Sequence, residues 1–202
     1  MLRDITQPMT ELEAVNVMLN NIGVRAVESF DTEDVTPEAE EAYNVLMTTL
    51  QEIQSKGWHF NTERDYTLLP DVNQQIQLPA ATLRVDSVRY SKPINVVQRG
   101  LRLYNGDRHQ YEFEAEDLDV NGELHADLVI SLTWDCVPHY IKWYATVKAA
   151  RRFANNKLAT GVAVQLSKID EDEAQIAAKN GDSINDDASL KVNPHVYDMR
   201  RK

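Results

Sequence analysis

Three glutamates stand at alternate positions in a stretch that otherwise carries apolar side chains. Glu112, Glu114 and Glu116 are separated by single residues, and Tyr111 and Phe113 lie between or beside them. On a β-strand, alternate residues point to the same side, so the carboxylates would share one face. Glycosidases use two such carboxyl groups, one protonated and one ionised. The alternative is the solvated face of a two-sided strand, which the period-two pattern explains without any chemistry.

Other residue types that carry common enzyme chemistry lack the spacing that the chemistry needs. No two of the five histidines are three or four residues apart, so no helical zinc pair is present: they are His59, His109, His125, His139 and His195. Cys136 is the single cysteine, and we expect a small buried residue rather than a nucleophile. The sequence also lacks a nucleophile elbow, a Walker A loop and a dinucleotide fingerprint. We therefore expect no enzyme, with no catalytic, cofactor-binding or metal-binding residues.

Two groups of residues, in or just before a helix predicted over 138–155, could have either a binding role or a structural role. Lys148, Arg151 and Arg152 could contact DNA or an acidic neighbour, or could simply be cations that the helix dipole favours near a C-terminus. Four aromatic residues nearby could stack on nucleic-acid bases or could form a core junction beside the β region. They are Trp134, Tyr140, Trp143 and Tyr144. Because the setting is not basic, the junction is the favoured interpretation for the aromatics.

Composition limits the classes of protein that remain. A chain of 202 residues with 43% hydrophobic residues can bury a core. It has no apolar run of the ~20 residues that span a bilayer, and residues 1–10 lack an apolar signal segment. A single cysteine excludes an internal disulfide and suits synthesis in a reducing host cytoplasm. The net charge of −11 disfavours tight binding of nucleic acid, because phosphates repel an acidic chain.

Helical patterns flank the middle of the chain. Apolar spacing predicts helices over 11–22, 37–56, 138–155 and 162–179. Thr10 and Glu13 form a capping-box pattern at the first, and Pro37 suits the first position of the second. Gly57 follows the second helix, and Gly181 is expected to stop the fourth.

The middle of the chain has the pattern of short strands. Extended runs are predicted over 65–69, 83–90 and 128–134. Leu101 and Leu103 alternate with polar residues, as do Tyr111 and Phe113, and a hairpin turn is predicted at Asn105-Gly106 between these runs. A second turn is predicted at Asn121-Gly122. The fold class is therefore α+β, a bundle of about four helices with an inserted antiparallel β domain.

The predicted domains follow from this order of elements. Residues 1–60 and 135–181 would form the helical bundle, and residues 61–134 the β-rich insertion. Residues 182–202 are polar and lack a period, which predicts an extended C-terminal arm. The end of the arm combines apolar residues with Arg200, Arg201 and Lys202, so it would either order against an adjacent subunit or the portal, or stay disordered throughout.

Separated blocks of the sequence resemble one known family. The blocks are IQSKGWHFN at 53–61 followed by TLLPD at 67–71, ELEAVN at 11–16 with IG at 22–23, and VP at 137–138 leading to AARRF at 149–153. In this order they resemble the tail tubular protein A family of podoviruses related to the T7 group. The resemblance runs from about 11 to 179 and is weakest in the β region.

The resemblance implies a structural role in the virion tail. Members form a dodecameric ring below the portal, join it to the nozzle (tail tubular protein B) and help to seat the tail fibres. The implied partners are thus other copies of the chain, the portal protein, the nozzle and the tail fibre, with genomic DNA passing through the lumen without tight binding. A virion protein that binds or cleaves glycans through the β-region carboxylates is the alternative.

Overall fold

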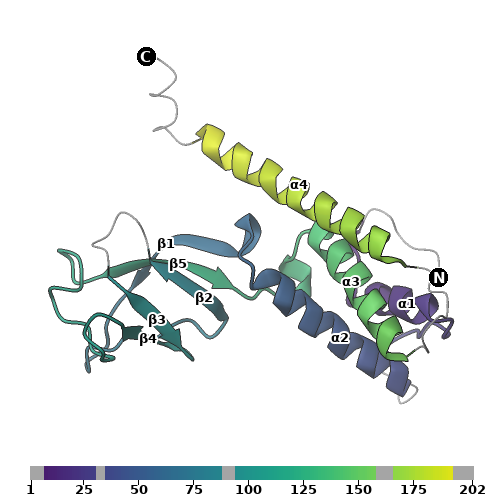
Figure 1. Ribbon diagram of the computed structural model, residues 1–202, viewed down its shortest axis with the longest axis horizontal. Coiled ribbons are helices and arrows are strands. Elements are labelled where there is room, and N and C mark those ends of the chain that lie inside the picture. The colour runs from purple at the N-terminus through teal and green to yellow at the C-terminus, as the bar shows by residue number, and fades with distance from the viewer. Residues whose placement is uncertain (1–6, 31–34, 88–93, 158–165, 193–202) are drawn as a thin grey trace. The chain divides into compact units, whose positions relative to one another are not determined.

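The structure is a computed structural model that describes residues 7–30, 35–87, 94–157 and 166–192 (Figure 1). Two compact units divide the chain. The helical unit is Met1–Ile53 with Thr133–Lys202, and the β unit is Gln54–Leu132. The mixed α+β class and the antiparallel sheets confirm the predicted fold class.

The helical unit is built around one central helix. Its described residues form α1 (Glu11–Asn21), α2 (Pro37–Gln54), α3 (His139–Lys157), α4 (Lys168–Val192) and the short turn η2 (Trp134–Cys136). Most of α3 is buried, because α1 and α4 both pack against it and side chains of α2 pair with it. The predicted capping box is confirmed: Thr10 Oγ1 accepts from the Glu13 N–H at 3.2 Å, and Glu13 Oε2 accepts from the Thr10 N–H at 2.9 Å.

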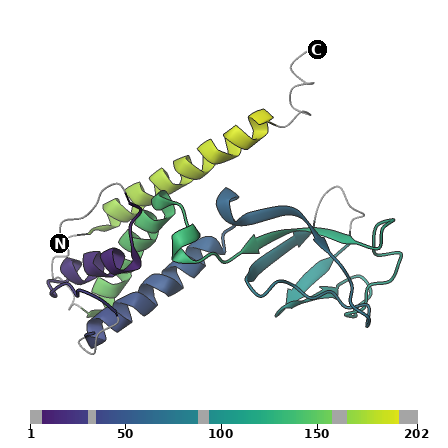
Figure 2. The same ribbon diagram turned by 180° about the vertical axis from the view of Figure 1, so that it is seen from behind.

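Helix α4 is longer than the sequence predicts. It passes through Gly181 and ends at Val192, and its last turns extend beyond the other helices of the unit (Figures 1 and 2). The predicted stop at Gly181, and an extended arm over 182–192, are therefore wrong. A Cβ at Gly181 would lie 2.8 Å from Cδ1 of Tyr140 on α3, so this glycine permits close helix packing instead of ending the helix. Residues 193–202, the rest of the predicted arm, lie outside the described residues.

The β unit has a three-stranded sheet and a two-stranded ribbon. Its described elements are η1 (His59–Asn61), β1 (Thr62–Leu68), β2 (Thr82–Ser87), β3 (Val96–Arg99), β4 (Arg102–Asn105) and β5 (Leu124–Ile130). The sheet order is β1-β5-β2, with β5 antiparallel to both neighbours. Leu124, Ala126 and Leu128 alternate along β5 and pack with Leu103 and Phe113 in the core of the unit.

The predicted hairpin has a different position. Strands β3 and β4 pair antiparallel and turn at Gly100, whose φ is +63°, with Arg99 opposite Arg102. The prediction of a two-residue turn at Asn105-Gly106 is wrong. The buried Asn105 side chain accepts from the N–H groups of Asp107 and Arg108, and the chain pairs again only at Gln110. This local bonding makes a wider loop than a two-residue turn.

The second predicted turn is confirmed in its place but not as a two-residue turn, because the Asp119 N–H donates to Glu123 O at 2.9 Å and three residues lie between them. At Asn121-Gly122 the chain reverses before β5, with Gly122 at φ +79° and the Gly122 N–H donating to Asp119 O at 3.1 Å. The carboxylate of Asp119 also accepts from the N–H groups of Asn121 and Glu123, at 2.9 and 2.8 Å. These two bonds fix the turn from its inner side.

Candidate functional site

The two ends of the β unit are held together by side-chain amides. Gln54 closes α2, and its Nε2 donates to Leu132 O at 3.0 Å while its Oε1 accepts from the Leu132 N–H at 2.8 Å. The Gln54 amide therefore pairs with Leu132 as the backbone of a neighbouring strand would, and it satisfies both the N–H and the carbonyl of Leu132. Gln54 and Leu132 are the first and last residues of the unit. We call this region, with Trp58, Asn61 and Ile130, the neck.

Asn61 is the centre of the neck and is 1% exposed. Its Nδ2 donates to Gln54 O at 3.0 Å and to Ile130 O at 2.8 Å, and its Oδ1 accepts from the Trp58 N–H at 2.9 Å. One side chain thus connects the end of α2, the turn η1 and the end of β5. Without Asn61, the Ile130 carbonyl and the Trp58 N–H would lose these partners, whereas Gln54 O also accepts from the Gly57 N–H.

Gly57 allows the chain to leave α2 at the neck. Its φ is +75°, and its N–H donates to Gln54 O at 3.1 Å, which closes the last turn of the helix. A Cβ there would lie 2.8 Å from Nη2 of Arg84 and 3.0 Å from Cγ2 of Val129. Arg84 Nη1 donates to Lys56 O at 3.3 Å, so the arginine also satisfies a carbonyl at the helix end. The prediction that Gly57 follows the helix is confirmed.

The three alternating glutamates do not form a shared strand face. Their segment has only an isolated bridge, between Gln75 and Glu112. Glu114 and Glu116 form ion pairs with one guanidinium, that of Arg108, at 2.9 and 3.0 Å. Asp117 also pairs with this guanidinium at 3.0 Å. Its hydrogen bond is the largest of the causes that raise the pKa of Arg108. The carboxylates of this segment therefore share one guanidinium as their partner, and the shared strand face that motivated the glycosidase hypothesis is not formed.

The cations of α3 pair with carboxylates of neighbouring helices. Lys148 Nζ lies 2.7 Å from Glu52 Oε1, Arg152 pairs with the other oxygen of Glu52, and Arg151 pairs with Glu171. The bond from Arg152, with that from Lys148, lowers the pKa of Glu52 to about 2. These cations therefore hold α2, α3 and α4 together within the helical unit, and neither sequence interpretation anticipated this.

The aromatic group and Cys136 are separated by the fold. Trp134 is buried and its Nε1 donates to Met9 O at 2.8 Å, while the Tyr144 hydroxyl accepts from Gln175 on α4 at 3.1 Å. Trp143 is exposed. The aromatics therefore do not form one stacking platform. Cys136 is exposed, so its predicted burial is wrong; the turn η2 places Trp134 inside and the cysteine outside.

One cluster in the β unit has the spacing of metal ligands. His125 Nε2 lies 3.6 Å from Asp119 Oδ2 and 3.6 Å from Glu123 Oε2, and ligand atoms of the three lie within 4.8 Å of one another. His125 Nδ1 lies 3.3 Å from Asp65 Oδ1. The hydrogen bond from the Glu123 N–H is the largest of the effects that lower the pKa of Asp119. The spacing of the histidines in the sequence does not reveal this cluster, because only one histidine contributes to it and the other two groups are carboxylates beside a turn.

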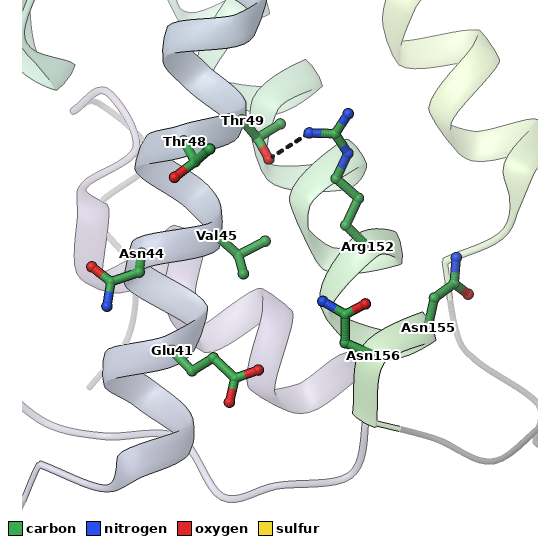
Figure 3. Close-up of a pocket in the computed structure, with 8 residues that line it drawn as sticks. All are labelled: Glu41, Asn44, Val45, Thr48, Thr49, Arg152, Asn155 and Asn156. Atoms are coloured by element: carbon green, nitrogen blue, oxygen red, sulfur yellow. Dashed lines mark hydrogen bonds between the residues drawn. The ribbon is translucent and has the colours of Figure 1, made fainter.

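A hollow of about 460 Å³ lies between α2 and α3 in the helical unit. Figure 3 shows Arg152 donating to Thr49 across it, at 3.4 Å. Its charged groups are already paired, Arg152 with Glu52 and Glu41 with Lys157. The lining is mostly amide and hydroxyl side chains: Glu41, Asn44, Val45, Thr48, Thr49, Arg152, Asn155 and Asn156. Nothing in this set supplies an activated nucleophile with its base.

In each of the two compact units, the side chains described above hold elements of that unit together. A family model described as tail tubular protein matches residues 12–188, so the chain belongs to the tail tubular protein family. This confirms the resemblance seen in the sequence and makes the chain a structural component of a bacteriophage virion tail. A search of curated proteins found no match to the chain. Within the described residues, no helix has both the length and the apolar character to cross a membrane.

Proposed function

We propose that the chain is the subunit of a ring that joins the portal to the nozzle, tail tubular protein B, and seats the tail fibres. The observation that carries this proposal is the family match, which spans both compact units from 12 to 188. The neck adds support. It holds the two ends of the β unit at fixed positions, as a subunit needs when different parts of it meet different neighbours.

Imaging of the purified chain with its portal tests this proposal. We expect a closed ring, of twelve subunits by the resemblance, seated on one end of the portal. A chain that binds the portal as single copies, or does not bind it, would overturn the ring. Portal-bound rings that then recruit the nozzle protein would establish the order of the tail.

We propose that the ring lets DNA pass without holding it. The chain carries a net charge of −11, and a repulsive wall acts over roughly a Debye length, about 8 Å at physiological salt. We expect weak binding of duplex DNA by the free protein at physiological salt. Submicromolar affinity under that condition would contradict this part of the proposal.

We also propose that the chain has no catalytic activity, because its carboxylate cluster around Arg108 is a set of ion pairs and the family is structural. The alternative was glycan cleavage through the same carboxylates. Incubation with host polysaccharide should give no turnover, and Glu114→Gln should behave as the parent protein does. Turnover that Glu114→Gln abolishes in a folded protein would restore the alternative.

A further inference from the structure

The outer face of the β3–β4 ribbon carries an arrangement that is unfavourable within the β unit itself. Arg99 and Arg102 are directly opposite one another across the two strands. Like charges in this position destabilise a strand pair. Among the described residues, no carboxylate forms an ion pair with either arginine. Arg102 instead donates to the amide oxygen of Gln75 at 3.2 Å, and that amide donates to Glu112. Such a pair gains stability when a negative group covers it.

Tyrosine rings hold both guanidinium groups in place. Arg99 Cζ lies 3.4 Å from the centre of the Tyr104 ring, and Arg102 Cζ lies 5.0 Å from that of Tyr111. The two rings meet edge to face at 5.3 Å. Stacking of this kind fixes the direction of an arginine before it meets a ligand. We call Arg99, Arg102, Tyr104 and Tyr111 the arginine–tyrosine face.

Apolar side chains border this face. Val97, opposite Tyr104, is 40% exposed, and Leu101 at the turn is 44% exposed. Arginine and tyrosine are enriched in protein–protein hot spots, and the exposed apolar side chains beside them add surface that a partner can bury. Duplex DNA would instead need several cations spread along its phosphates. The face therefore fits an acidic protein surface that also carries apolar side chains.

The chain itself presents such a surface on α4. Ile169, Asp172, Glu173 and Ile176 follow the spacing of one helical face, opposite the face on which Ala178 is buried. The isoleucines are 70% and 59% exposed. Asp172 pairs with Lys168, whereas no ion pair joins Glu173 to another described residue. We call these four residues the α4 face.

We infer that the arginine–tyrosine face of one copy docks on the α4 face of a second copy. Charge complementarity supports this pairing, because unpaired guanidiniums would meet Glu173 while Val97 and Leu101 cover exposed isoleucines. The two faces differ, so the contact is heterologous, and repetition of a heterologous contact produces a ring or a helical filament. The inference rests on the proposed ring and names the surfaces that would close it.

Two variants test the pairing when they are measured alone and mixed. Arg99→Glu/Arg102→Glu destroys the first face, and Ile169→Asp/Ile176→Asp destroys the second. Each alone should associate with itself roughly thirtyfold more weakly than the parent protein, the loss expected for hot-spot residues. Mixed, they should form one-to-one dimers and nothing larger, because each variant keeps one intact face. Sedimentation or light scattering gives these masses.

Matched controls separate these effects from general changes of charge or stability. Arg25→Glu reverses an exposed arginine outside both faces, and Val120→Asp places a carboxylate at a fully exposed apolar site. Both should assemble as the parent protein does. Circular dichroism melting of all variants verifies folding, and a variant that does not fold is replaced by Arg102→Gln or Ile176→Ser.

Three outcomes would overturn the inference. In the first, portal-bound rings form equally well with both variants, which would leave the proposed ring intact and remove only these surfaces. In the second, the variants do not associate singly and their mixture stays monomeric, which would mean that the faces do not meet each other. In the third, duplex DNA binds the parent protein and not Arg99→Glu/Arg102→Glu, which would assign the face to phosphates. If the parent protein forms no ring, alone or on its portal, the proposed function fails as well.

Discussion

Replacement of Asn61 tests whether the neck holds the β unit together. In Asn61→Ala two backbone groups lose the partner that Asn61 supplies, the carbonyl of Ile130 and the N–H of Trp58, while Gln54 O keeps its bond from the Gly57 N–H. Each buried group left unsatisfied costs about 1–3 kcal/mol. Water can enter the space of the deleted amide and recover part of this loss. We therefore expect a loss near the lower end of the sum, about 2 kcal/mol of unfolding free energy.

A second substitution at the same position separates hydrogen bonding from packing. Asn61→Asp keeps the size of the side chain and the acceptor for the Trp58 N–H, but it loses both donors and places a carboxylate beside two carbonyl oxygens. The pKa of the new carboxyl should therefore be raised in the folded state. Since protonation restores one donor, this variant should gain stability relative to the parent as the pH falls below neutral.

Urea unfolding monitored by tryptophan fluorescence measures both effects, because Trp58 lies in the neck. Asn73→Ala is the matched control, since Asn73 is an exposed asparagine of the same unit. It should change the unfolding free energy by no more than about 0.5 kcal/mol. If Asn61→Ala costs no more than Asn73→Ala, or if Asn61→Asp shows no gain at lower pH, the role given to Asn61 is wrong.

Three further substitutions follow from the same contacts. Gly57→Ala should cost more stability than Gly23→Ala. Both glycines have φ +75°, but of the two only Gly57 has atoms within 4 Å of the added Cβ. Equal losses in thermal melts would contradict this. Gly181→Ala should be neutral or destabilising in the parent protein, because contact with the Tyr140 ring opposes a helix-propensity gain of about 1 kcal/mol. In a Tyr140→Ala background the same substitution should stabilise the protein. A double-mutant cycle without coupling would refute the contact. The folded-state pKa of Glu52 is about 2 against an ordinary 4.5, so its contribution is present above about 4.5 and is lost as the pH falls toward 2. Glu52→Gln should flatten that part of the stability profile, and an unchanged acid limb in denaturant titrations would show that these ion pairs contribute nothing.

Patterns that depend on neighbours in the chain were readable from the sequence. The capping box at Thr10 and Glu13 and the helix end at Gly57 involve residues three or four positions apart, so their geometry is set by the local backbone. The turn at Asn121-Gly122 is local in the same sense. The α+β class followed from the order of such local signals, and the tail tubular family from the resemblance of separated sequence blocks.

Features that depend on distant residues were decided only by the tertiary structure. Gly181 has the composition of a helix stop, yet it lies inside α4 because Tyr140 packs against it. Two arginines read as a helix-terminal pair are bound by Glu52 and Glu171 from other helices. The bond from Asn61 to Ile130 spans 69 positions. The type of a side chain determines which groups it can bond to, but packing determines which partner it meets. A buried polar group must use whichever donor or acceptor the fold brings beside it.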